Sequence, residues 1–190
     1  MTKIVETKLP GVFEIVPPRF GDERGYFSET YNARVLAKHG LKLDFVQDNH
    51  SLSRDKGVLR GLHFQRDPWA QDKLVRVTRG AVFDVAVDIR KGSPFYGQWV
   101  GIEITAEKGN QLLVPRGFAH GFVTLEPNTE FLYKVTNPYS KEEDRSVRFN
   151  DPAIGIDWPL SADALTLSDK DKQAPLLADS DNTFIFEGSL

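Results

Sequence analysis

The stretch that decides the fold is Val58-Leu59-Arg60-Gly61-Leu62-His63-Phe64-Gln65, an apolar run that carries a cation, an imidazole and an amide. Successive side chains of a β-strand point to opposite faces, so His63 and Gln65 share one face of this run. The apolar Leu62 and Phe64 share the other face. A buried strand rarely holds Arg, His and Gln within six residues unless they have partners. The run is therefore either a surface strand with scattered polar residues or one wall of a site.

The composition is that of an ordinary globular protein. The chain has 190 residues, of which 40% are apolar and 27% charged, and its net charge is −3. We expect one domain over residues 1–190. The weak net charge and the lack of a basic block argue against nucleic acid or an anionic membrane as a partner. The chain has no run of about 18 apolar residues, so no membrane span is expected.

Two further features bear on location and chemistry. The first residues, Met1-Thr2-Lys3-Ile4-Val5-Glu6, lack the apolar stretch of a signal peptide, so we expect a cytoplasmic protein. The absence of cysteine excludes disulfides, thiol catalysis and thiolate metal ligands.

Short alternating runs separated by Gly and Pro fill most of the chain. The clearest covers residues 81–89, where Phe83, Val85, Val87 and Ile89 face one way. Eight or more such runs predict a mainly β jelly-roll barrel or sandwich. Residues 121–125 and 129–136 are expected to form a hairpin around Pro127-Asn128.

Helical signals are few. Tyr31 to His39 is predicted to be helical, with Asn32 as its N-cap and Gly40 as its stop. After about Asp151 the chain becomes rich in Pro and Asp, and we expect these last 40 or so residues to wrap the barrel rather than form a second domain.

A second informative stretch, Gly109 to Gly121, indicates which fold family the chain resembles. It has Gly, five residues, Pro, one residue, Gly, two residues and His, which resembles the second motif of the cupin superfamily. Gly57 to His63 resembles the start of the first motif. Many cupins bind a divalent metal through His-x-His and Glu in the first motif and His in the second. Here Gln65 replaces the second His and the next Glu is Glu103, so we expect no bound metal.

A narrower resemblance covers nearly the whole chain. Seven segments, in the same order, are similar to motifs of the dTDP-4-dehydrorhamnose 3,5-epimerases, which are metal-independent enzymes of dTDP-L-rhamnose synthesis. The segments span residues 20–25, 46–50, 59–65, 83–88, 117–122, 130–134 and 168–171. The resemblance implies a homodimer that exchanges N-terminal strands, no cofactor, and a 4-keto sugar attached to dTDP as the substrate.

The residues suit the implied chemistry. The ketone at C4 acidifies the protons on C3 and C5, so inversion at each carbon needs a base, an acid on the other side of the ring and a cation at the enolate oxygen. His63 is the candidate base, because imidazole titrates near physiological pH. Tyr133 is the candidate acid, and Lys73 is the candidate cation.

The carboxylate that orients His63 is less certain from the sequence. The resemblance points to Asp171, since the family motif has its Asp after Lys. The strand pattern leaves Asp84 as a rival because it lies on the polar face of its strand. Asp169 is a weaker rival.

Binding roles follow from side-chain chemistry and from the resemblance. Arg24 and Arg60 suit the diphosphate, because a guanidinium fork matches phosphate oxygens. Tyr139 resembles the residue that stacks on thymine. Asp144, where the family has Glu, and Lys170 stand at matching binding positions. The remaining candidates for sugar, phosphate or nucleoside contacts are Glu29, Gln47, Asp48, Asn49 and His120.

Three other functions fit parts of the pattern. A related enzyme could epimerise only C3 or isomerise the keto sugar. A silent cupin could bind the sugar nucleotide without turnover. A metal-dependent cupin is the third alternative.

Overall fold

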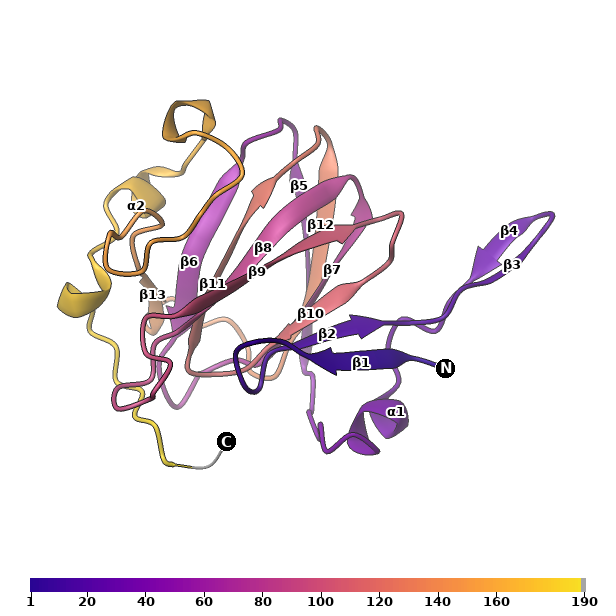
Figure 1. Cartoon of the computed structure of the whole chain (residues 1–190), viewed down its shortest axis with the longest axis horizontal. Coiled ribbons are helices and arrows are strands. Elements are labelled where there is room, and N and C mark those ends of the chain that lie inside the picture. The colour runs from indigo at the N-terminus through magenta and orange to yellow at the C-terminus, as the bar shows by residue number, and fades with distance from the viewer. Residues whose placement is uncertain (189–190) are drawn as a thin grey trace.

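Two β-sheets that face each other form the body of the protein, whose computed structural model describes residues 1–188 (Figure 1). The larger sheet has the strand order β1 (Lys3–Glu6), β2 (Phe13–Val16), β10 (Gln111–Val114), β7 (Lys73–Arg79), β12 (Thr129–Val135) and β5 (Gln47–Ser53). The smaller sheet has the order β13 (Asp144–Ser146), β6 (Leu59–Gln65), β11 (Phe118–Thr124), β8 (Ala81–Asp88) and β9 (Trp99–Thr105). The prediction of a mainly β jelly-roll sandwich is confirmed.

The remaining elements are short. The hairpin of β3 (Phe20–Asp22) and β4 (Gly25–Phe27) projects away from the body (Figure 1). The helices are α1 (Ala33–Ala37) and α2 (Asp169–Lys172), and the 3-10 turns are η1 (Ala162–Ala164) and η2 (Leu177–Asp179).

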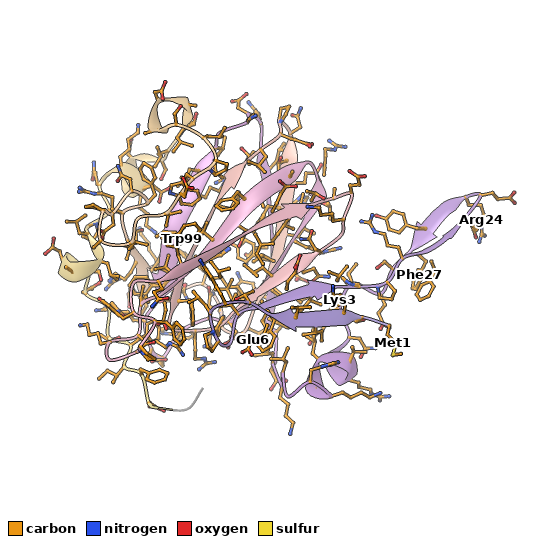
Figure 2. The ribbon with its side chains drawn as sticks, viewed as in Figure 1. Met1, Lys3, Glu6, Arg24, Phe27 and Trp99 are labelled. Atoms are coloured by element: carbon orange, nitrogen blue, oxygen red, sulfur yellow. The ribbon has the colours of Figure 1, made fainter. Side chains whose placement is uncertain are left out.

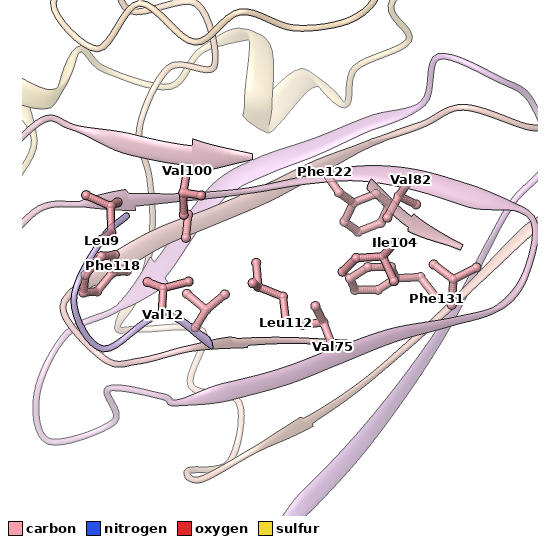
Figure 3. Close-up of a cluster of buried hydrophobic side chains, with 13 residues drawn as sticks. Leu9, Val12, Val75, Val82, Val100, Ile104, Leu112, Phe118, Phe122 and Phe131 are labelled. Carbon is pink, nitrogen blue, oxygen red and sulfur yellow. The ribbon is translucent and has the colours of Figure 1, made fainter. Parts of the chain in front are cut away.

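The main core lies between the two sheets. Val75, Leu112 and Phe131 of the larger sheet meet Val82 and Phe122 of the smaller one (Figure 3). The rings of Phe122 and Phe131 stack with their centroids 4.0 Å apart. Removing this apolar area from water, at about 25 cal/mol per Å², is what drives the two sheets together.

A second core explains the alternation along β8. Val85 and Val87 face away from the inter-sheet core and pack against Ile154, Leu177 and Phe184. The chain after β13 therefore covers the outer face of the smaller sheet. Both faces of β8 are buried, and the polar residues on its inner face must find partners there.

The third core fixes α1 on the outer face of the larger sheet. Leu36 packs with Leu74 and Leu113. The Asn32 side chain accepts from the backbone N–H groups of Arg34 and Val35, which is the predicted N-cap. The helix is shorter than the predicted Tyr31–His39, because the cap starts it at Ala33 and it ends with Ala37.

The expected hairpin of residues 121–125 and 129–136 is wrong. β11 pairs with β6 and β8, whereas β12 pairs with β5 and β7. The short connection around Asn128 carries the chain from one sheet to the other. Sequence proximity alone cannot separate these outcomes, because a tight turn and a crossover between facing sheets use the same turn residues.

Close approach of β6 and β11 gives the first prediction. Gly61 has a φ of 136°, and a Cβ there would lie 2.5 Å from the Cα of Gly121. Gly92 has a φ of 85° but open space around it. We expect Gly61→Ala to lower the free energy of unfolding by about 3 kcal/mol or more, since backbone strain and overlap both act. Gly92→Ala should cost about 1 kcal/mol, because only strain acts there. Urea denaturation measures both changes, and equal losses would contradict the argument.

Candidate active site

One cavity between the sheets gathers most of the predicted catalytic residues. Its volume is about 590 Å³, and the side chains that line it include Arg60, His63, Lys73, His120, Tyr133 and Asp171. They come from β6, β7, β11, β12 and α2. Strands of both sheets thus face one space.

His63 and Asp171 form a hydrogen-bonded pair in this cavity. His63 Nε2 lies 2.6 Å from Asp171 Oδ1. The other carboxylate oxygen of Asp171 accepts from the Ser168 hydroxyl at 2.8 Å. Burial alone would raise the pKa of Asp171, but His63, Ser168 and the charge of Lys170 together hold that pKa below its ordinary value. Asp171 is therefore ionised at neutral pH.

A second imidazole–carboxylate pair lies on the neighbouring strand. His120 stands directly opposite His63 in the register of β11 and β6. Its Nε2 lies 2.9 Å from Asp84 Oδ1. Burial raises the pKa of Asp84, against the opposing influence of His120 and Lys73. The two carboxylates left open by the sequence thus have separate partners, and Asp169 contacts neither imidazole but lies 3.5 Å from Lys172.

Lys73 is the cation of the cavity. Burial lowers the pKa of its ammonium to about 8, although the carboxylates of Asp144 and Asp84 act in the opposite direction. The ammonium remains the main form at neutral pH, and it can stabilise negative charge that develops beside it.

Tyr133 approaches the same cavity from the larger sheet. It pairs with Asn49 of β5 in the register, and its ring packs 5.9 Å from that of Phe131. Burial raises the pKa of the phenol, Arg60 opposes this, and Asp144 adds to it. The hydroxyl is therefore protonated at neutral pH.

Several binding candidates are joined to one another by hydrogen bonds. The Tyr139 hydroxyl lies 3.1 Å from Asp144 Oδ2, and Lys170 forms an ion pair with the same carboxylate. Gln47 donates to Asn49 at 2.8 Å and accepts from the backbone N–H of Tyr139 at 3.2 Å.

Three candidates lie elsewhere within one chain. Figure 2 shows Arg24 at the far end of the β3–β4 hairpin, where it pairs with Asp22. Glu29 and Asp48 line a second cavity of about 450 Å³, on the other side of β12. Asp48 also forms an ion pair with Lys134 at 2.9 Å. The structure does not bring these three side chains to His63.

One residue of the site was missed. Ser168 caps α2 and holds Asp171, because its hydroxyl oxygen also accepts from the Asp171 backbone N–H at 3.2 Å. The spacing Ser-x-x-Asp in Ser168-Asp169-Lys170-Asp171 is a helix-capping pattern that could have identified it.

The described residues offer little to a metal ion. Within residues 1–188, no three His, Asp or Glu side chains are grouped so that they could hold one. Each cavity imidazole instead points a nitrogen at its own carboxylate. The expectation of a metal-free site stays a prediction.

Comparison with known proteins assigns the family. A family model described as dTDP-4-dehydrorhamnose 3,5-epimerase matches residues 6–179. The dTDP-4-dehydrorhamnose 3,5-epimerase of Salmonella typhimurium is 56% identical over 178 residues, which cover 93% of this chain and 96% of the relative. The chain belongs to the dTDP-4-dehydrorhamnose 3,5-epimerase family.

Solved structures of the family agree with this assignment. The dTDP-6-deoxy-D-glucose-3,5-epimerase of Legionella pneumophila, in complex with dTDP-4-keto-L-rhamnose, has a TM-score of 0.89 at 46% identity, covering 94% of each chain. A 3'-monoepimerase of Streptomyces bikiniensis, in complex with dTDP-quinovose, has a TM-score of 0.84 at 31% identity, covering 90% of this chain and 86% of that one. None of the helices within residues 1–188 has the length and apolar character to cross a membrane.

The environment of Lys73 gives the second prediction. NMR titration of ¹³C-methylated lysines should show Lys73 changing charge near pH 8, because burial penalises the ammonium. Asp84→Asn should move this titration to still lower pH, since it removes a carboxylate that favours the charged form. A Lys73 signal that titrates at the ordinary lysine value of about 10.4 would contradict the buried environment.

Proposed function

We propose that this chain inverts C3 and C5 of dTDP-4-dehydro-6-deoxy-D-glucose to give dTDP-4-dehydro-L-rhamnose, without a metal. The observation that carries the proposal is that a carboxylate-paired imidazole and a protonated phenol line one cavity from two facing sheets. Membership of the epimerase family supports the choice of substrate. We also propose the cytoplasm as its location, since nucleotide sugars are made from nucleoside triphosphates there.

His63 is the proposed base. The neutral imidazole takes the proton from the carbon next to the ketone, and the ionised Asp171 stabilises the imidazolium that results. The hydrogen bond to Asp171 occupies Nε2, so Nδ1 is the nitrogen that exchanges the proton. The electron pair of the broken C–H bond moves into the enolate and onto the C4 oxygen.

Lys73 is the proposed partner of that oxygen. Its side chain lines the cavity, and because its ammonium is buried there, its charge acts in a medium of low polarity. The stabilisation is larger for the enolate than for the neutral ketone, which is the condition for lowering the barrier.

Tyr133 is the proposed acid. Its raised pKa keeps the proton on the phenol until a carbanion is close enough to take it. Since Tyr133 belongs to β12 and His63 to β6, the new C–H bond at C5 forms on the face of the ring opposite the one that lost its proton. Inversion then follows from the placement of the two groups.

The other residues that line the cavity, together with the hydrogen-bonded group around Tyr139, are proposed to bind the sugar nucleotide. Arg60 serves the diphosphate, and the exposed ring of Tyr139 stacks on the thymine. The other proposed contacts are Gln47, Asn49, His120, Asp144 and Lys170. The proposal gives Glu29 and Asp48 no direct substrate contact within one chain.

A homodimer with exchanged N-terminal strands is part of the proposal. Phe20, Tyr26 and Phe27 on the β3–β4 hairpin are 62%, 63% and 70% exposed. So much aromatic surface on a projecting hairpin favours a second copy as its partner. Arg24 at the tip would then reach the partner's cavity.

A C3-only epimerase remains the second candidate, because the chain is also similar to a 3'-monoepimerase. A silent sugar-nucleotide binder would bind dTDP without exchanging substrate protons.

Proton exchange in heavy water tests the catalytic roles. For the wild type we expect solvent deuterium at both C3 and C5, observed by NMR of the substrate. His63→Ala should abolish exchange, because no base remains. Tyr133→Phe should still exchange but invert C5 poorly, because the opposing acid is lost. Calorimetric titration with dTDP is the control for folded sites. Deuterium at C3 alone in the wild type would support the C3-only alternative, and no exchange despite dTDP binding would support a silent binder.

Subunit complementation tests the role of Arg24. Arg24→Ala and His63→Ala should each be inactive or strongly impaired alone. In mixed dimers, one of the two sites would combine an intact His63 with an intact Arg24 from the partner. When the two variants pair at random, half of the dimers are mixed and each mixed dimer has one intact site of two. The mixture should therefore recover about one quarter of the wild-type activity. Co-expression with two affinity tags isolates the mixed dimer, and a mixed dimer as inactive as its parents would rule out the exchange.

A further inference from the structure

Amide side chains from both sheets hold the turn that carries Tyr139. Gln65 of β6 accepts from the Ser140 backbone N–H at 2.8 Å and donates to the Pro138 carbonyl at 3.2 Å. Gln47 of β5 accepts from the Tyr139 backbone N–H at 3.2 Å. β5 is an edge strand of the larger sheet and β6 belongs to the smaller one. The turn is thus fixed to one strand of each sheet.

Both N–H donors of the Gln65 amide are in use. Its nitrogen also donates to the Trp69 carbonyl at 2.7 Å, so two donors and one acceptor are in use. The side chain is 4% exposed. A carboxamide offers two N–H donors and an acceptor oxygen, whereas a neutral imidazole offers one of each and a carboxylate has no donor. The amide is therefore the chemical group that this position requires.

The Tyr139 ring depends on this backbone support. The ring is 59% exposed, and its hydroxyl contacts Asp144 at the surface. Few side-chain contacts can hold an exposed ring, so its position is set mainly by the direction of its own backbone. That direction is fixed by the bonds from Gln47 and Gln65.

We infer that Gln65 is a positioning residue for nucleotide affinity, which acts by holding Tyr139 where the base stacks. The inference rests on the proposed function, in which Tyr139 binds the thymine. It also gives a reason for Gln at the position where metal-binding cupins have their second His. The side chain is engaged with the loop backbone and does not line the cavity.

Binding and turnover of Gln65→Met test this role. Methionine keeps the length of the side chain but removes all three hydrogen bonds. We expect the Kd for dTDP, measured by calorimetry, to rise about tenfold, while kcat at saturating substrate stays within about twofold. Gln71→Met is the matched control. It removes one amide bond to the residue that precedes the turn, from Gln71 Nε2 to the Asn137 carbonyl at 2.7 Å, but none to Pro138–Ser140. Its Kd for dTDP should change less than twofold.

A double-mutant cycle with Tyr139→Ala separates positioning from general damage. If Gln65 acts through the ring, adding Gln65→Met to Tyr139→Ala should raise the Kd for dTDP less than twofold further. Full additivity, or a loss of kcat with an unchanged Kd, would overturn the inference. If Tyr139→Ala itself leaves dTDP affinity unchanged, the stacking role in the proposed function fails instead. Should Gln65→Met not fold, Gln65→Glu replaces it in the same cycle, because it keeps the side-chain length and the acceptor for the Ser140 N–H but loses both donors, and the same coupling is expected.

Discussion

The buried hydrogen bond between His63 and Asp171 is the constraint on which the rest of the site depends. It joins residues 108 positions apart and requires α2 to lie against β6. A carboxylate buried this deeply is tolerated only when its charge is compensated, and His63 and Ser168 provide that compensation. Apolar contacts of Leu177 and Phe184 hold the C-terminal segment on the outer face of the smaller sheet. Apolar burial on the outer face of the smaller sheet therefore helps to hold Asp171 beside His63.

Local patterns predicted the fold where local energetics decide it. The alternation along residues 81–89 gives the two buried faces of β8, and the Asn32 cap gives the start of α1. Local patterns failed at the connection around Asn128, where the choice between hairpin and crossover depends on which sheet buries each strand. That choice is a property of the whole sandwich, so no short window of sequence contains it.

The site was predictable as a set of residues but not as a set of pairs. Asp84 and Asp171 both suit an imidazole, and the strand pattern alone could not separate them. The resemblance favoured Asp171 for His63, and the tertiary structure pairs Asp171 with His63 and Asp84 with His120. Asp48 lines the second cavity for a simpler reason. It follows Gln47 directly in β5, and adjacent residues of a strand face opposite sides of the sheet. The side chain of Asp48 therefore points away from the face that carries Gln47 and Asn49.

The charges around Lys73 depend on one another. Burial favours neutral forms of both Lys73 and Asp84, and each makes the charged form of the other less costly. His120 adds a hydrogen bond to Asp84, so it supports the Lys73 ammonium through that carboxylate. Loss of the Asp84 carboxylate would lower the pKa of Lys73 further. In the proposed mechanism, the second imidazole–carboxylate pair keeps a cation available between the two sheets, and the first pair exchanges protons with the substrate.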